Sequence, residues 1–341
     1  MQQGPVYIGL DYHSRSVQVC VVDQKGAVLV NRRCGNSVVE VAGTVRAEWR
    51  VGRVAIESCC GAADLADALK REAGWPVELA HPGYVHRMKQ NPDKTDYADA
   101  KMLAELCRAS FLPPVWLAPA WIRELRLLIR LRADLIGRIR TIKTRILAVL
   151  RAQRINEPLK PGRWSKGWLT WIRGSEQLSE MAGFVVRTHL EEWESLKARV
   201  RDVEAKLDGK LCDDAVVQKL LEQPGVGKIT AWTMRALIGE FSRFRTGKQL
   251  SRFCAVTPRN SSSGERVADS GLVRAGDPLL KSVLIEAAHR LRRYDPRWGQ
   301  LAEGMAAKGK ATSVIVAAIA NRWMRWLYHR VKEVEVPAAA A

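Results

Sequence analysis

The first hundred residues alternate between short β-rich apolar runs and segments with helical spacing, which predicts an α/β region. A turn at residues 24–27 separates the second and third apolar runs, as in a hairpin. The segments predicted as strands are 6–11, 17–23, a run from 28, 54–57 and 77–80. The segments predicted as helices are 37–50, 62–73 and 95–110.

The remainder of the chain has mostly helical patterning. Pro113, Pro114 and Pro119 interrupt the pattern and indicate a boundary. Two long apolar stripes, at 121–154 and about 189–210, predict a coiled-coil arm that could serve as a dimer element, with a plain helical linker as the alternative. The predicted regions are an α/β domain at 1–112, a helical coiled-coil region at 113–215, a mostly α-helical domain at 216–333 and a frayed tail at 334–341.

The charge balance indicates a polyanionic partner. Fifty-five Lys and Arg against 36 Asp and Glu give a net charge of +19. The most apolar stretch, 311–320, is ended by Asn321 and Arg322 and is too short to cross a membrane. We expect a cytoplasmic, nucleoid-associated protein of bacterial type, because the seven cysteines, an odd number scattered along the chain without a CxxC pair, do not suit a disulfide framework, and no export signal is predicted.

Four carboxylates occupy positions where a metal site is expected. Asp11 ends the first predicted strand, Glu57 ends the fourth, and Asp96 and Asp99 lie one turn apart at the start of the last helix of this region. The order of elements predicts an RNase H-like sheet, in which these strands are neighbours and the helix packs across their ends. Clustered carboxylates repel unless a cation neutralises them, so we predict Mg²⁺, as a pair of ions with Mn²⁺ as a substitute.

Other interpretations of these acids are open. An Asp at a strand end can be a turn former, and Asp96 could cap a helix that has Asp99 in its first turn. Asp23 and Asp93 are nearby competitors that lack the same placement. His13 is interpreted as a solvated side chain rather than a phosphate contact.

Several sequence blocks resemble the DEDD-type insertion-sequence transposases of the Piv/MooV group, the insertion-sequence family numbered one hundred and ten. The N-terminal blocks are Tyr7-Ile-Gly-Leu-Asp11, Ile56-Glu-Ser-Cys-Cys-Gly61 and Lys94-Thr-Asp-Tyr-Ala-Asp-Ala100. The C-terminal blocks are Gln223-Pro-Gly-Val-Gly-Lys-Ile-Thr-Ala231 and Phe253-Cys-Ala-Val-Thr-Pro-Arg259 with Ser262-Ser-Gly264. The resemblance therefore covers both ends of the chain and leaves the middle unanchored.

The resemblance implies a RuvC-like N-terminal domain, a coiled-coil region and a C-terminal domain with a nucleophilic serine. The serine before the glycine would be Ser263, although Ser261 and Ser262 leave the register open. Arg274 stands where the family has a lysine. The family implies a phosphoserine–DNA intermediate, double-stranded donor and target DNA, a structured guide RNA encoded by the element, and a dimer or tetramer.

Basic residues near these blocks are candidate nucleic-acid contacts. Lys228 follows the turn at Pro224-Gly-Val-Gly227, which is either a phosphate-binding turn or a plain connection between helices. The other candidates are Arg138, Arg140, Lys143 and Arg145 on the first long helix, and Arg259, Arg266 and Arg274 near the serine. The competing functions are a RuvC-like metal-dependent nuclease or Holliday junction resolvase that uses water, and a non-enzymatic nucleic-acid scaffold.

Overall fold

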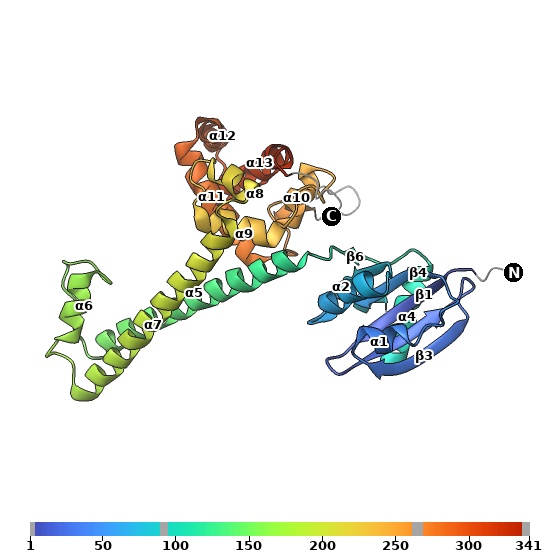
Figure 1. Ribbon diagram of the computed structural model, residues 1–341. Coiled ribbons are helices and arrows are strands. Elements are labelled where there is room, and N and C mark those ends of the chain that lie inside the picture. Colours follow the sequence, from blue (N-terminus) through green and yellow to red (C-terminus); the bar gives the residue numbers. More distant parts are fainter. Residues whose placement is uncertain (1–3, 89–94, 261–268, 336–341) are drawn as a thin grey trace. The chain divides into compact units, whose positions relative to one another are not determined.

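The computed structural model of the protein describes residues 4–88, 95–260 and 269–335. The chain divides into two compact units, Met1–Ala120 and Trp121–Ala341. The first unit is mixed α/β and the second is mostly helical (Figure 1).

The first unit is built on a six-stranded sheet with the order β3-β2-β1-β4-β5-β6. Strand β1 is antiparallel to β2 and parallel to β4, and β4 is parallel to β5. The predicted adjacency of the first and fourth strands is therefore confirmed. The strands are β1 (Val6–Tyr12), β2 (Ser16–Val22), β3 (Val28–Gly35), β4 (Val51–Glu57), β5 (Val77–Ala80) and β6 (Pro114–Val115).

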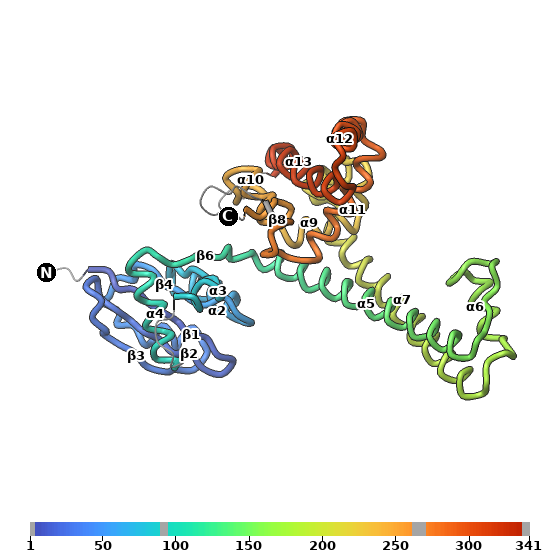
Figure 2. Tube along the Cα trace, turned by 180° about the vertical axis from the view of Figure 1, so that it is seen from behind, coloured from blue at the N-terminus to red at the C-terminus, as the bar shows by residue number. Residues whose placement is uncertain are grey.

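Helices cover both faces of this sheet, and its two apolar cores follow from the alternation of side chains along the strands. Ile8 and Ile56 pack with Leu65 and Leu69 of α2 on one face. Ala55 packs with residues of α4 on the opposite face. The helices are α1 (Val38–Ala42), α2 (Ala62–Glu72), α3 (Pro82–Met88) and α4 (Asp96–Arg108), and the Cα trace shows them from behind (Figure 2).

Two expectations for this unit need correction. The helix predicted over 37–50 is limited to α1, where Ser37 caps the N-terminus and Gly43 the C-terminus. Trp49, which the predicted helix included, reaches the core from a bend beyond α1. The proline segment interpreted as a boundary contributes β6, which pairs with β5 at the sheet edge, where a proline is tolerated. The first unit accordingly extends to Ala120.

Gly9 lets α4 pack directly on β1. A Cβ atom at this position would overlap the carbonyl oxygen of Ala100 and the amide nitrogen of Ala104. Backbone atoms cannot give way as a flexible side chain can, so only glycine allows this approach.

Replacing Gly9 with Ala is expected to lower the free energy of unfolding by about 1–3 kcal/mol, as overpacking of a core typically does. Urea denaturation of the two proteins measures the difference. Gly137→Ala is the control, because Gly137 lies within a helix and a Cβ placed there would have no atom within 4 Å. This control should be as stable as the wild-type protein or slightly more stable. An unchanged denaturation midpoint for Gly9→Ala would show that α4 can shift without cost.

Two long helices dominate the first part of the second unit. Helix α5 (Ala120–Ala152) and helix α7 (Glu180–Leu211) run antiparallel, because Glu124 pairs with Lys210 and Arg132 with Glu204. Helix α7 begins earlier than the predicted residue 189, with Ser179 as its cap. The predicted coiled coil remains a prediction. Buried residues recur on each helix every three or four positions, apart from one gap of six between Ile129 and Leu135. They are Ile122, Leu125, Ile129, Leu135, Ile139, Ile142, Ile146 and Leu150 on α5, and Val186, Leu190, Trp193, Leu196, Val200, Val203, Leu207 and Leu211 on α7.

The remaining elements of the second unit are helical apart from one strand pair. Trp323, Phe241 and Leu284 are fully buried in its core. The tail predicted from 334 is not frayed at Glu335, whose carboxylate pairs with Arg235 and accepts from two backbone amides. Among the described helices, none is long and apolar enough to cross a membrane. These elements are α6 (Lys166–Arg173), α8 (Ala215–Leu221), α9 (Lys228–Ile238), α10 (Gly247–Phe253), β7 (Pro258–Asn260), β8 (Asp269–Leu272), α11 (Pro278–Tyr294), α12 (Pro296–Ala307) and α13 (Thr312–Lys332).

Candidate functional site

The ends of β1 and β4 place two acids side by side. Leu10 pairs with Ile56 in the parallel register, so Asp11 and Glu57 are the next residues on the two strands. Leu10 and Ile56 face the core under α2. Since side chains alternate along a strand, Asp11 and Glu57 project to the opposite face, the one that α4 covers.

The N-terminus of α4 supplies the other two acids. Thr95 caps this helix by accepting from the amide of Ala98 at 3.2 Å. The alternative in which Asp96 is the cap is therefore wrong, and its carboxylate is available to other partners. Asp96 and Asp99 lie in the first helical turn, where the helix dipole favours negative charge. Asp99 is 8% exposed and so is almost fully buried.

His13 joins two of these carboxylates. Its Nε2 lies 3.3 Å from an oxygen of Asp11 and 3.3 Å from an oxygen of Asp96. This nitrogen is buried and makes no hydrogen bond of regular geometry. The interpretation of His13 as a solvated side chain is therefore wrong for its Nε2, although the side chain is 43% exposed. The spacing could have indicated this, because His13 follows Asp11 by two residues and so shares its face of the extended chain.

The electrostatics of the group favour a bound cation. The pKa of Asp11 is raised, first by burial and also by the negative charges of Asp96 and Asp99, while His13 lowers it. A carboxylate in this environment holds its charge at a cost. A positive ion next to Asp11 would remove that cost.

The structure brings some of the predicted ligands together more closely than others. One ligand atom from each of Asp11, His13 and Asp96 lies within 4.8 Å of the others, a group that could hold a metal ion. Glu57 lies at the same sheet edge as Asp11, and Asp99 lies in the same helix turn as Asp96, but neither belongs to this group. The two carboxylates and the imidazole nitrogen that lies between them fit a divalent cation, because oxygen and imidazole nitrogen are ordinary ligands of such ions.

The competing acids are placed differently. Asp23 accepts from the amides of Lys25 and Ala27 at 2.8 Å each, so it stabilises the turn after β2. Asp93 lies outside the described residues. Asp23 therefore has a structural role in this turn.

The serine of the C-terminal block, Ser263, lies outside the described residues, as do Ser261, Ser262 and Arg266. The flanking segments form β7 and β8, an antiparallel pair in which Pro258 is opposite Leu272. Arg259 on β7 and Arg274 after β8 are exposed. The roles of Ser263 and its neighbours stay predictions.

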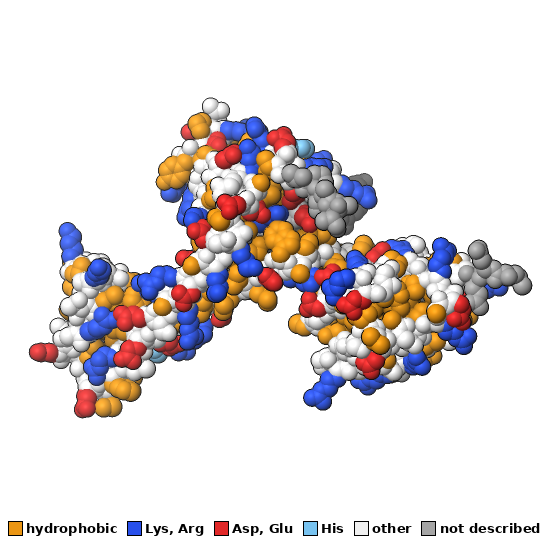
Figure 3. All heavy atoms as spheres, viewed as in Figure 1, with side chains coloured by type: hydrophobic (Ala, Val, Ile, Leu, Met, Phe, Trp, Pro, Cys, Tyr) orange, Lys and Arg blue, Asp and Glu red, His pale blue; other side chains and the backbone are white. Residues whose placement is uncertain are grey.

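The predicted nucleic-acid contacts differ in their surroundings. Lys228 pairs with Asp208 at 2.7 Å, at the start of α9. Arg138 lies 3.5 Å from Glu192. Lys143 lies 4.8 Å from the Trp164 ring, and its pKa is lowered mainly by burial. Arg140 and Arg145 are exposed, and Figure 3 shows Lys and Arg side chains mixed with acids over the visible surface.

The sheet thus carries acids at the ends of β1 and β4, and two more acids begin α4, an arrangement compatible with a DEDD-type transposase. Two family models agree with this class: one described as "Transposase", for the DEDD region of IS110 elements, matches residues 8–154, and one described as "Transposase IS116/IS110/IS902 family" matches residues 217–303. The chain belongs to the IS110 family of DEDD transposases and thus takes part in DNA transposition.

Similar proteins support this assignment along nearly the whole chain. A Pseudomonas aeruginosa protein named "Probable family 20 transposase" is 26% identical over 94% of this chain and 95% of its own length. The transposase for insertion sequence element IS1111A of Coxiella burnetii is 26% identical over 84% of this chain and 78% of its own. The transposase for insertion sequence element IS1328 of Yersinia enterocolitica is 24% identical over 93% of this chain and 94% of its own length.

Proposed function

We propose that this transposase moves an insertion element by metal-assisted, serine-mediated strand exchange. The observation that carries the proposal is the convergence of Asp11, His13 and Asp96 at the edge of the sheet. The strand order, with β1 between β2 and β4, supports an RNase H-like, RuvC-like N-terminal domain. The part of the predicted 113–215 region that follows Ala120 would form a coiled-coil region, and 216–333 the domain that carries the serine.

Asp11, Glu57, Asp96 and Asp99 would hold the metal, which we propose to be a pair of Mg²⁺ ions. When bound, such ions stabilise the charge that develops on the oxygens of a phosphoryl transfer. The chain's own contribution is to fix the carboxylates on rigid elements, with Asp11 and Glu57 on strands and the other two on α4. His13 would keep its Nε2 directed at Asp11 and Asp96 and so hold their orientation.

Ser263 would supply the nucleophile. Its Oγ would bond to the scissile phosphorus as the bridging oxygen of the DNA strand leaves as a hydroxyl, taking one proton. A hydroxyl from another strand would then attack this phosphoserine and release the serine. Arg259, Arg266 and Arg274 are placed by sequence near the serine and would neutralise the phosphate.

The proposed partners are DNA, RNA and further copies of the chain. The protein would bind donor and target DNA as a dimer or tetramer, and a structured RNA of the element would guide the choice of site. Lys228, Arg138, Arg140, Lys143 and Arg145 are proposed contacts to nucleic acid. Arg140 and Arg145 are exposed, whereas Lys228 would first have to release Asp208.

A covalent adduct tests the serine mechanism. Incubation of the protein with end-labelled element DNA and Mg²⁺, followed by denaturing electrophoresis, should reveal labelled protein. Ser263→Ala should abolish this band, while Ser262→Ala, its neighbour, should retain it. If Ser263→Ala cleaves DNA normally and the wild-type protein forms no adduct, water is the nucleophile and the chain acts as a metal-dependent nuclease or junction resolvase.

A further inference from the structure

A basic pocket lies in the second unit, between the start of α10, the start of α12 and the C-terminal half of α13. Its volume is about 810 Å³, within the range of roughly 300–1,000 Å³ that ligand-binding pockets occupy. Among the described residues that line it, none is acidic. The cationic side chains that line the basic pocket are Arg245, Lys248, Arg297, Arg322 and Arg325, with His329 beside them.

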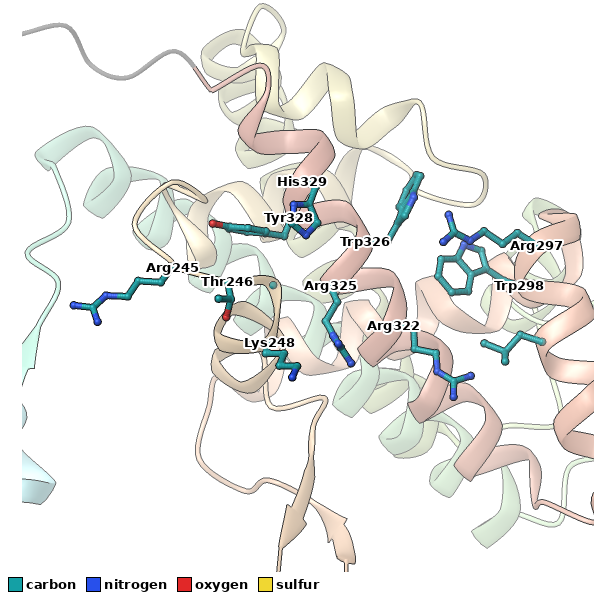
Figure 4. A pocket seen from close by; sticks show the side chains of 12 residues that line it. Arg245, Thr246, Lys248, Arg297, Trp298, Arg322, Arg325, Trp326, Tyr328 and His329 are labelled. Atoms are coloured by element: carbon teal, nitrogen blue, oxygen red, sulfur yellow. The ribbon is translucent and has the colours of Figure 1, made fainter.

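The side chains of the basic pocket are drawn in Figure 4. The side chains of Lys248, Arg322 and Arg325 end on the same side of the pocket, whereas Arg245 extends away from them. Arg297 of α12 lies 5.0 Å from the ring centroid of its neighbour Trp298 and 5.2 Å from the ring centroid of Trp326 on α13. Three elements thus present cations to one concave surface.

Several basic residues of the second unit are paired with acids, whereas three cations of the basic pocket are not, among the residues that the structure describes. Elsewhere in the second unit, Arg132 and Lys228 each lie 2.7 Å from a carboxylate. Within the ranges that the structure describes, no ion pair joins Lys248, Arg322 or Arg325 to an acid. Because like charges held together repel, this arrangement favours binding of an anion.

The walls of the basic pocket are held at a fixed separation. A Cβ on Gly247 would lie 2.7 Å from the carbonyl oxygen of Arg325, so the start of α10 rests directly on α13. The buried hydroxyl of Tyr328 also donates to the carbonyl of Phe244 at 2.7 Å. The backbone that carries the cations is therefore in place before a ligand arrives, which reduces the entropy lost on binding.

A second cavity continues from the basic pocket toward the strand pair. It has a volume of about 870 Å³ and is also lined by Arg322 and Arg325. Its other walls include Pro258 of β7 and Leu272 of β8. A ligand on the two arginines can therefore extend in both directions, as a chain molecule with repeated negative charges would.

We propose that the basic pocket binds the phosphodiester backbone of a single nucleic-acid strand, with phosphates on Arg322 and Arg325. Guanidinium groups suit this ligand because each can donate two parallel hydrogen bonds to a phosphate. A concave pocket accommodates one strand more readily than the broad surface of a duplex. This inference rests on the proposed function in one respect, namely that the second unit handles nucleic acid, and it assigns a site outside the carboxylate group and the serine block.

The test measures binding of the full chain to a labelled single strand of DNA, to a labelled single strand of RNA and to the DNA duplex. Each single strand has about 20 nucleotides, which exceeds a binding site of roughly 4–16 nucleotides. Chelator is present so that no cleavage occurs. The double variant Arg322→Ala with Arg325→Ala should bind a single strand at least about tenfold more weakly. Because each phosphate contact on a single strand contributes roughly 0.7 to the slope of log K against log salt, the slope should fall by about 1.4. A loss with DNA only, or with RNA only, would identify the strand that the pocket takes.

Controls separate this site from net charge and from misfolding. Arg199→Ala with Arg201→Ala removes the same charge from exposed positions of α7 and should leave the affinity unchanged. Arg322→Lys with Arg325→Lys keeps both positive charges in the pocket and should restore the salt slope, which shows that the loss in the alanine variant comes from the missing charge. Equal weakening by the α7 control, or weakening of duplex binding alone, would overturn the proposal.

The outcome is distinguishable from failure of the proposed function. Binding is measured without metal and without chemistry, so an inactive recombinase can still show the pocket effect. Conversely, if the double variant at Arg322 and Arg325 binds single strands as the wild-type protein does while wild-type protein forms the serine adduct, the pocket proposal fails and the mechanism stands.

Discussion

Asp11→Asn is expected to reduce DNA cleavage by more than about 100-fold, above the 10–100-fold effect typical of residues that only orient a metal ligand. The amide keeps the size of the carboxylate but removes its charge from the group formed with His13 and Asp96. Rates of strand cleavage in Mg²⁺, together with titration of the protein with Mn²⁺, measure the loss of catalysis and of metal binding in parallel.

Asp23→Asn is the matched control for Asp11→Asn. Asp23 is also an acid at the end of a strand of the same sheet, but it accepts from backbone amides in a turn, and an amide oxygen can take over that role. The Asp23→Asn protein should cleave DNA and bind Mn²⁺ as the wild-type protein does. If Asp11→Asn behaved like this control in both measurements, the group at the sheet edge would not be the metal site.

The stability of Asp11→Asn in chelator gives a second measurement. Burial and neighbouring acids raise the pKa of Asp11, so the folded protein binds this proton more tightly than the unfolded chain. The contribution of Asp11 to stability therefore falls as pH rises from its ordinary value of 3.8 through the raised folded value. Asn at position 11 removes that loss, and the metal-free variant should be at least as stable as the wild-type protein at neutral pH.

Arg235→Ala is expected to lower the free energy of unfolding by about 3–5 kcal/mol, the usual effect of removing one partner from a buried ion pair. The Arg235 side chain is 9% exposed and bonds to Asp214 at 2.9 Å and to Glu335 at 3.2 Å. It also donates to the carbonyl of Gly239 at 2.8 Å. Its loss would leave two largely buried carboxylates without this counter-charge.

Urea denaturation, followed by circular dichroism, measures the effect of Arg235→Ala. Arg252→Ala is the control, because Arg252 is an exposed arginine of the same unit, on α10. It should change the stability by less than about 0.5 kcal/mol, as exposed substitutions generally do. A similarly small change for Arg235→Ala would mean that Asp214 and Glu335 find water or other donors in solution.

The local sequence was informative where an element is determined by its own residues. The β5 strand has the predicted limits of 77–80, and the turn at 24–27 has Gly26 with a φ of +86°. The last helix of the first unit begins next to the predicted position because Thr95 can cap it. By contrast, the helix predicted over 37–50 ends at Gly43, and Trp49 is buried by the tertiary fold from a bend outside that helix.

The sequence by itself determined the candidate acids, the excess of positive charge and the resemblance to transposases, because strand ends, helix starts and composition are local properties. Only the tertiary structure decided that the Nε2 of His13 meets Asp11 and Asp96, and that Glu335 neutralises Arg235 from far along the chain. The same holds for Arg322 and Arg325, which the sequence shows only as two more basic residues on a helix. Such groupings depend on the register of strands and the packing of helices. The sequence of one segment cannot determine how far its residues lie from residues elsewhere in the chain.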